Sequence, residues 1–81
     1  MTREAILEQL KGVLEVANSG MDYSTVSEGD NLNTDLGMTS IGMLLTIITI
    51  EESFHIRFDD VGFNDFVTVG DVIDYIQTKL A

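Results

Sequence analysis

The chain has 81 residues, a net charge of −10, 44% hydrophobic residues and no cysteine. A chain of this length is expected to form one domain, spanning residues 1–81, with a core of modest size. The negative charge disfavours binding to nucleic acid or to anionic lipid surfaces, and it favours basic partner surfaces. Without cysteine, disulfides and cysteine-containing zinc motifs are excluded.

The first residues show no basic segment followed by an apolar one, as a signal peptide would. The longest apolar-rich run, residues 41–50, is too short to cross a bilayer. We therefore expect a cytoplasmic, monomeric protein that does not insert into membranes.

A first helix is predicted from Thr2, a suitable N-cap, with Glu4 in its first turn and Gly20 near its end. Its apolar residues follow the spacing of a helix with one buried face; they are Ile6, Leu7, Leu10, Val13, Leu14 and Ala17. Residues 18–39 then form a long polar loop.

The loop should be anchored in the core by Val26, Leu32 and Leu36. Its segment 30–35 resembles the start of a calcium-binding loop but lacks the ligand and glycine pattern that such a loop requires. Leu32 occupies a ligand position, and Asp35 stands where the glycine is required, so no metal site is predicted.

A second helix is predicted over residues 40–54, with Thr39 as its N-cap. Four apolar residues share its core face, namely Met43, Ile47, Ile50 and Phe54. A second apolar row contains Ile41, Leu44, Leu45 and Ile48, and a narrow polar strip runs through Gly42, Thr49 and Ser53. The second row is either buried against further neighbours or exposed for a partner.

After this helix, residues 55–58 are predicted to form a loop in which Ile56 or Phe58 reaches the core. Residues 59–66 should contain a short helical turn. Thr68 is placed to cap a last helix, with Asp71 completing a capping box and Lys79 in the last turn. The last helix presents Val69, Val72, Ile73, Ile76 and Leu80 on one face. The predicted fold is an all-α bundle of three main helices and one short helix.

Catalytic groups are scarce. The only histidine, His55, is predicted to be a surface residue, about 20 Å from Ser40 at the other end of the same helix. Glu51 and Glu52 are adjacent and point in different directions, so they do not form a carboxylate pair. No catalytic residue is predicted.

Three separated segments carry a resemblance to a known family. Asp35-Leu36-Gly37 is followed by Ser40-Ile41, then by Ile50-Glu51-Glu52-Ser53-Phe54, and residues 68–76 form a third matching segment. Together they make residues 30–78 similar to acyl carrier proteins. The resemblance implies a four-helix bundle with 4′-phosphopantetheine on Ser40. A phosphopantetheinyl transferase would attach it from coenzyme A, and acyl-loading and acyl-modifying enzymes would be the other partners.

The resemblance also implies a cargo pocket and a partner surface. The pocket would be lined by Ile50, Phe54, Phe58, Phe66 and Val72. The partner surface would combine the second apolar row of the 40–54 helix with acids that attract basic partners, which are Asp35, Glu51, Glu52, Asp59 and Asp60.

Three positions depart from the family pattern, because Thr39, Gly42 and Leu45 stand where acids are common. Fatty-acid biosynthesis is the default pathway that the resemblance implies, and the chain would be a substrate of enzymes rather than an enzyme. The departures favour a dedicated set of partners and keep polyketide, specialised lipid and aminoacyl pathways open. The alternative is an unmodified helical adaptor that binds a partner through the second apolar row.

Overall fold

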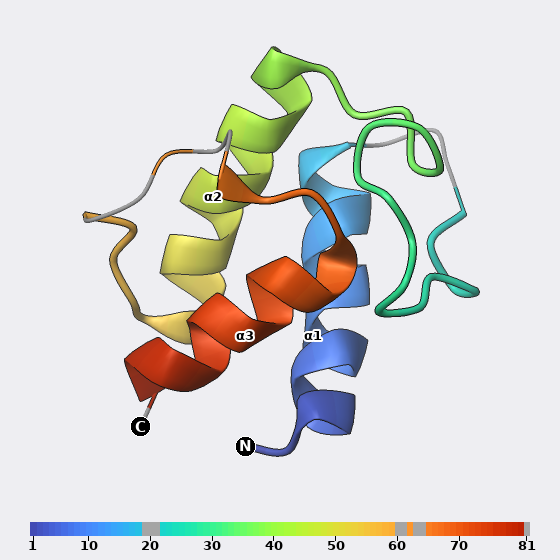
Figure 1. Ribbon diagram of the computed structural model, residues 1–81. Helices are drawn as coiled ribbons and strands as arrows, with labels where there is room; N and C mark the ends of the chain where they lie inside the picture. The colour runs from blue at the N-terminus through green and yellow to red at the C-terminus, as the bar shows by residue number, and fades with distance from the viewer. Residues whose placement is uncertain (19–21, 60–61, 63–64, 81) are drawn as a thin grey trace.

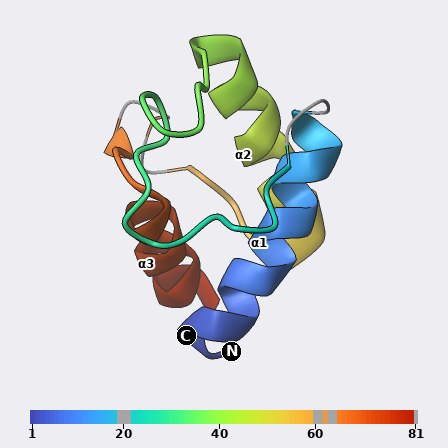
Figure 2. The same cartoon turned by 90° about the vertical axis from the view of Figure 1, so that its right-hand side faces the viewer.

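The computed structural model describes residues 1–18, 22–59, 62 and 65–80. Within these residues the chain forms the helices α1 (Arg3–Ala17), α2 (Ser40–Phe54) and α3 (Val69–Leu80), and no strand longer than an isolated bridge. Helix α1 packs against both α2 and α3, which lie across it at different angles (Figures 1 and 2). The all-α class and the positions of the three main helices are confirmed.

Each helix begins at a predicted cap. Thr2 and Thr39 precede α1 and α2, and each side chain accepts a hydrogen bond from the backbone N–H three residues later. At α3, the Thr68 hydroxyl accepts from Asp71 N at 3.2 Å, and Asp71 Oδ2 accepts from Thr68 N at 3.0 Å. This reciprocal pair satisfies N–H groups that a helix start leaves without intrahelical partners.

The core is built from one face of each helix. Its helical residues are Ile6, Leu10, Val13 and Leu14 of α1, then Met43, Ile47, Ile50 and Phe54 of α2, and Val69, Val72, Ile73 and Ile76 of α3. The predicted faces are therefore confirmed, except at their margins. Leu7 and Ala17 are only half-buried, and Leu80 is exposed because it ends α3.

The long loop is fastened to the start of α3. Val26, Leu32 and Leu36 are buried as predicted, and Tyr23 and Met38 are two further buried anchors. Leu32 N donates to Val67 O at 2.9 Å, and Asn31 forms a bridge with Thr68. Figure 2 shows the loop passing from α1 to the start of α3 before it returns to α2. Gly20, predicted near the end of α1, lies outside the described residues.

The segment after α2 closes the bundle. His55 ends the helix in the left-handed conformation (φ 57°) and is exposed, as predicted. Ile56 is buried and Phe58 is half-buried, so both side chains contribute to the core. The short helical turn predicted over residues 59–66 falls mostly outside the described residues; within them, Asp65 N donates to Gly62 O at 3.0 Å.

Candidate functional site

The loop before α2 gives each residue of the Asp35-Leu36-Gly37 segment a structural role. Asp35 Oδ2 accepts a hydrogen bond from Asn31 N at 2.7 Å and so closes the turn of residues 31–36. Leu36 is buried, and Gly37 has φ 65°, a conformation that favours glycine. The segment therefore fixes the path of the chain into α2, where Ser40 is the first helical residue and is exposed.

Ser40 lies where negative charge is stabilised. Thr39 occupies two N–H groups of α2, because its hydroxyl accepts from Gly42 N and its carbonyl accepts from Met43 N. The N–H groups of Ser40 and Ile41 have no acceptor among the described residues. The first turn of α2 contains no acid. Free N–H groups at the positive end of the helix dipole suit a phosphate ester on Ser40.

Gly42 faces α1 rather than solvent. A Cβ at this position would lie 2.8 Å from Asn18 Oδ1, and the Asn18 amide also donates to Thr46 Oγ1 at 2.8 Å. Thr46 in turn donates to Gly42 O at 2.8 Å and is buried. An acid at position 42 would displace this network, so the departure from the family pattern there has a structural cause.

The predicted polar strip of α2 is not a solvated face. Gly42 is buried, and Gln9 of α1 donates from Nε2 to the Ser53 hydroxyl at 2.9 Å. Two residues of the strip therefore contact the α1 segment, beside the apolar packing of the core. Hydropathy alone did not reveal this contact, because small and polar side chains make it.

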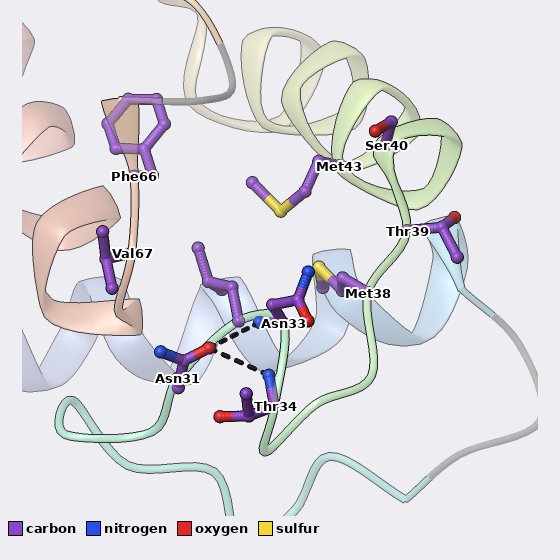
Figure 3. A pocket seen from close by; sticks show the side chains of 10 residues that line it. Asn31, Asn33, Thr34, Met38, Thr39, Ser40, Met43, Phe66 and Val67 are labelled. Atoms are coloured by element: carbon purple, nitrogen blue, oxygen red, sulfur yellow. Dashed lines mark hydrogen bonds between the residues drawn. The ribbon is translucent and has the colours of Figure 1, made fainter.

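An open groove of about 280 Å³ begins at Ser40 (Figure 3). Its polar lining residues are Asn31, Asn33, Thr34, Thr39 and Ser40. Its apolar lining residues are Leu32, Met38, Met43, Phe66 and Val67. Sequence reasoning did not identify this groove, although the polar segment 30–35 that was tested for calcium supplies much of one wall.

Beneath the groove, four of the five predicted cargo-pocket residues come together. Ile50, Phe58, Phe66 and Val72 line an apolar void of only about 10 Å³, whereas Phe54 is buried but does not line it. A void of this size holds one water molecule at most. The inner space is therefore filled by side chains in this state of the protein.

Most of the predicted steering acids are already engaged. Besides Asp35, Glu51 Oε2 accepts from Phe58 N at 2.8 Å, and Asp59 Oδ1 pairs with Lys79 Nζ at 3.0 Å. Glu52 is exposed and has no partner among the described residues, and Asp60 lies outside them. These contacts give the acids structural roles that the sequence did not reveal.

The second apolar row of α2 is exposed. Ile41 is 72% exposed, and Leu44, Leu45 and Ile48 are 45% to 50% exposed. The interpretation that neighbours bury this row is therefore wrong for the isolated chain, and an apolar stripe at i, i+3, i+4 and i+7 is left on the surface. This stripe begins one residue after Ser40.

Within the described residues, no three His, Cys, Asp or Glu side chains gather closely enough to hold a metal ion. Ser40 and His55 lie at opposite ends of α2. No described helix is long and apolar enough to cross a membrane. The site thus consists of an exposed hydroxyl, a helix N-terminus, a groove and an apolar stripe.

Comparison with known proteins agrees with this geometry. The family described as a phosphopantetheine attachment site matches residues 4–76. An acyl carrier protein of Thermotoga maritima is 33% identical over 79 residues, covering 98% of this chain and 96% of the relative. An acyl carrier protein of an Exiguobacterium species is 32% identical over 80 residues, covering 99% of this chain and 100% of the relative. An acyl carrier protein of Chlamydia caviae is 33% identical over 72 residues, covering 89% of this chain and 92% of the relative.

The chain therefore belongs to the acyl carrier protein family and carries a 4′-phosphopantetheine prosthetic group. Proteins of this family are carriers rather than catalysts. The residues at the start of α2 fit the group, since an exposed hydroxyl, two free N–H groups and an adjoining groove meet there.

Proposed function

We propose that Ser40 is the attachment residue and that residues 1–81 form a single cytoplasmic carrier of acyl groups. The observation that supports this most strongly is the place of Ser40, which is exposed at the first position of α2 and follows the Asp35-Leu36-Gly37 turn. When bound, the prosthetic group supplies a terminal thiol that holds an acyl group as a thioester. The chain is a substrate of the enzymes that load and modify the cargo, and does not catalyse these steps itself.

The residues of the site have separate tasks in this proposal. Thr39 caps α2 and leaves the Ser40 and Ile41 N–H groups free to stabilise a phosphodiester. The exposed stripe of Ile41, Leu44, Leu45 and Ile48 receives the phosphopantetheinyl transferase and the acyl-handling enzymes. Glu52 is the acid at the far end of the stripe with no partner among the described residues.

Fatty-acid biosynthesis is the proposed default pathway, since the relatives are named acyl carrier proteins. The apolar start of α2 supports a dedicated partner set, in a polyketide, specialised lipid or aminoacyl pathway, over the general fatty-acid enzymes. The two versions are separated by offering the loaded carrier to standard fatty-acid enzymes. Turnover as efficient as that of an ordinary carrier would reject the dedicated set.

Intact mass tests the attachment. The protein is incubated with coenzyme A and a phosphopantetheinyl transferase of broad specificity, and we expect a gain of one phosphopantetheine group. Ser40→Ala should abolish the gain, whereas the matched control Ser24→Ala, at another exposed serine, should leave it intact. A gain that persists in Ser40→Ala would place the attachment elsewhere.

The alternative of an unmodified adaptor rests on the exposed apolar stripe of α2, and the match to a phosphopantetheine attachment family speaks against it. It predicts that none of several transferases modifies the protein. It also predicts that Ser40→Ala leaves partner binding intact.

A further inference from the structure

The groove beside Ser40 has polar groups that the fold does not use. Asn31 Oδ1 accepts the N–H groups of Asn33 and Thr34 at 2.8 and 2.9 Å, which holds this wall of the groove in place. The side chains of Asn33 and Thr34 are exposed and have no hydrogen-bond partner within the described part of the chain. Figure 3 shows the Asn33 amide directed into the groove, on the side of Met38 and Met43.

We propose that this groove is the resting site of the phosphopantetheine arm, with Asn33 and Thr34 as its polar contacts. The inference rests on the proposed attachment at Ser40. A pantetheine arm alternates amide groups with short apolar segments, and the groove offers the complementary pattern of a polar wall and an apolar floor. Its volume of about 280 Å³ is near the lower limit of small-ligand pockets, about 300 Å³.

The floor of the groove limits how deep a bound group can lie. Leu32, Met43 and Phe66 line both the groove and the void of about 10 Å³ beneath it. Phe66 is also held by edge contacts with Phe58 and Tyr75, whose ring centroids each lie 5.7 Å from its own. The arm is therefore expected to rest on these side chains without displacing them.

A second groove of comparable size provides a contrast. It has a volume of about 380 Å³ and includes Phe66, but its other lining residues include Asp65, Asp71 and Asp74 rather than Ser40. Three carboxylates would repel an arm that carries a phosphodiester. The proposed attachment at Ser40 and the absence of these three carboxylates both favour the groove that begins at Ser40 as the site of the arm.

Nuclear magnetic resonance on the modified protein tests this proposal without any enzyme assay. Intact mass first establishes that Ser40 carries the arm. We then expect nuclear Overhauser contacts from the geminal methyl groups of the arm to the Met38 and Met43 methyl groups. The Asn33 side-chain amide and Val67 N–H resonances should shift between the unmodified and modified proteins. Signals of Thr78, in the acidic groove, should not shift.

Two variants sharpen the test. Asn33→Asp places a carboxylate in the groove and should weaken the contacts and shifts, whereas Thr78→Ala should leave them unchanged. Asn33 is exposed, so the backbone spectrum should show that both variants fold. Full attachment with no contacts, and with shifts confined to residues 39–42, would overturn the resting site while leaving the proposed function intact. Absence of attachment would overturn both.

Discussion

Asp71 connects the start of α3 to the chain before it. Its Oδ2 accepts hydrogen bonds from Val67 N at 2.9 Å and Thr68 N at 3.0 Å, which lower the pKa of the Asp71 carboxyl below its ordinary value. Because the ionised form is the better acceptor, the folded state favours it. The stabilisation is complete above the unfolded pKa and disappears as the pH falls through the lower folded pKa.

Asp71→Asn should therefore lower the free energy of unfolding by about 1 kcal/mol at pH 7, the usual loss at a helix cap. The difference from the parent protein should shrink as the pH falls from the unfolded pKa of Asp71 towards its lower folded pKa, and it should be smallest below the folded pKa. Urea unfolding at a series of pH values measures this difference in the free energy of unfolding. Glu52→Gln, at an exposed carboxylate without a partner among the described residues, is the matched control and should have little effect. A loss that does not depend on pH would contradict the electrostatic cause.

A second prediction for a single residue concerns the effect of Gly42→Ala on stability. Alanine within a helix is normally more stable than glycine by about 1 kcal/mol. Here the added Cβ would lie 2.8 Å from Asn18 Oδ1, and Asn18 is held by its bond to Thr46. Gly42→Ala should consequently be destabilising by about 1 kcal/mol, because losing the Asn18–Thr46 hydrogen bond at the buried Thr46 costs about 2 kcal/mol, which exceeds the gain from alanine.

A double-mutant cycle isolates that cause. In an Asn18→Ala background nothing opposes the new methyl group, so Gly42→Ala should become neutral or stabilising. Chemical unfolding of the four proteins gives the coupling energy. Additive effects of the two substitutions would show that Asn18 is not what requires glycine at position 42.

At the scale of elements, α2 divides its surface among three tasks. One face enters the core through Met43, Ile50 and their neighbours, and another contacts α1 through Gly42 and Ser53. The third is the exposed stripe. Because small and polar residues make part of the contact with the α1 segment, the apolar residues of α2 outnumber those that the core buries. This surplus is what makes the stripe a docking surface in our proposal.

Leu45 tests the stripe. Leu45→Ser should raise the KM of the phosphopantetheinyl transferase for the carrier by about tenfold, if one apolar contact of about 1.4 kcal/mol is lost. The free energy of unfolding should change by less than about 0.5 kcal/mol, because the side chain is exposed. Val16→Ser on α1, at a residue that is 77% exposed, is the control for lost surface hydrophobicity. Equal effects of the two substitutions on KM would reject the stripe as the docking surface.

For the whole molecule, the features that could be predicted are those that depend on residues close together in the sequence. The helices and their caps at Thr2, Thr39 and Thr68 depend on residues a few positions apart, and the sequence predicted them correctly. The contacts of Glu51 with Phe58 N and of Asn18 with Thr46 join separate elements, and neither was predicted. The groove at Ser40 was missed for the same reason, since its walls come from three segments that only the fold brings together.

Acidic residues far outnumber basic residues in this chain. Its net charge is −10, with four lysine and arginine residues in total. Arg3 at the start of α1 donates from Nε to Glu28 of the long loop at 3.0 Å and from Nη1 to Gln77 of α3 at 3.0 Å, and it also pairs with Asp74. One cation thus connects the loop with two helices, in a protein whose excess acids repel one another.

Arg3→Gln should lower Tm more than Lys11→Gln does. Both substitutions change the net charge from −10 to −11, but within the described part of the chain Lys11 pairs only with Glu8, in α1 itself. The difference between the two variants therefore reports the links from α1 to the loop and to α3, rather than net charge. Added salt should raise Tm for all three proteins, because it screens the repulsion among acids, and it should narrow the gap between the variants. Thermal unfolding at low and high sodium chloride measures both effects. Equal Tm values for Arg3→Gln and Lys11→Gln at low salt would show that net charge alone, and not the Arg3 contacts, limits the stability of this fold.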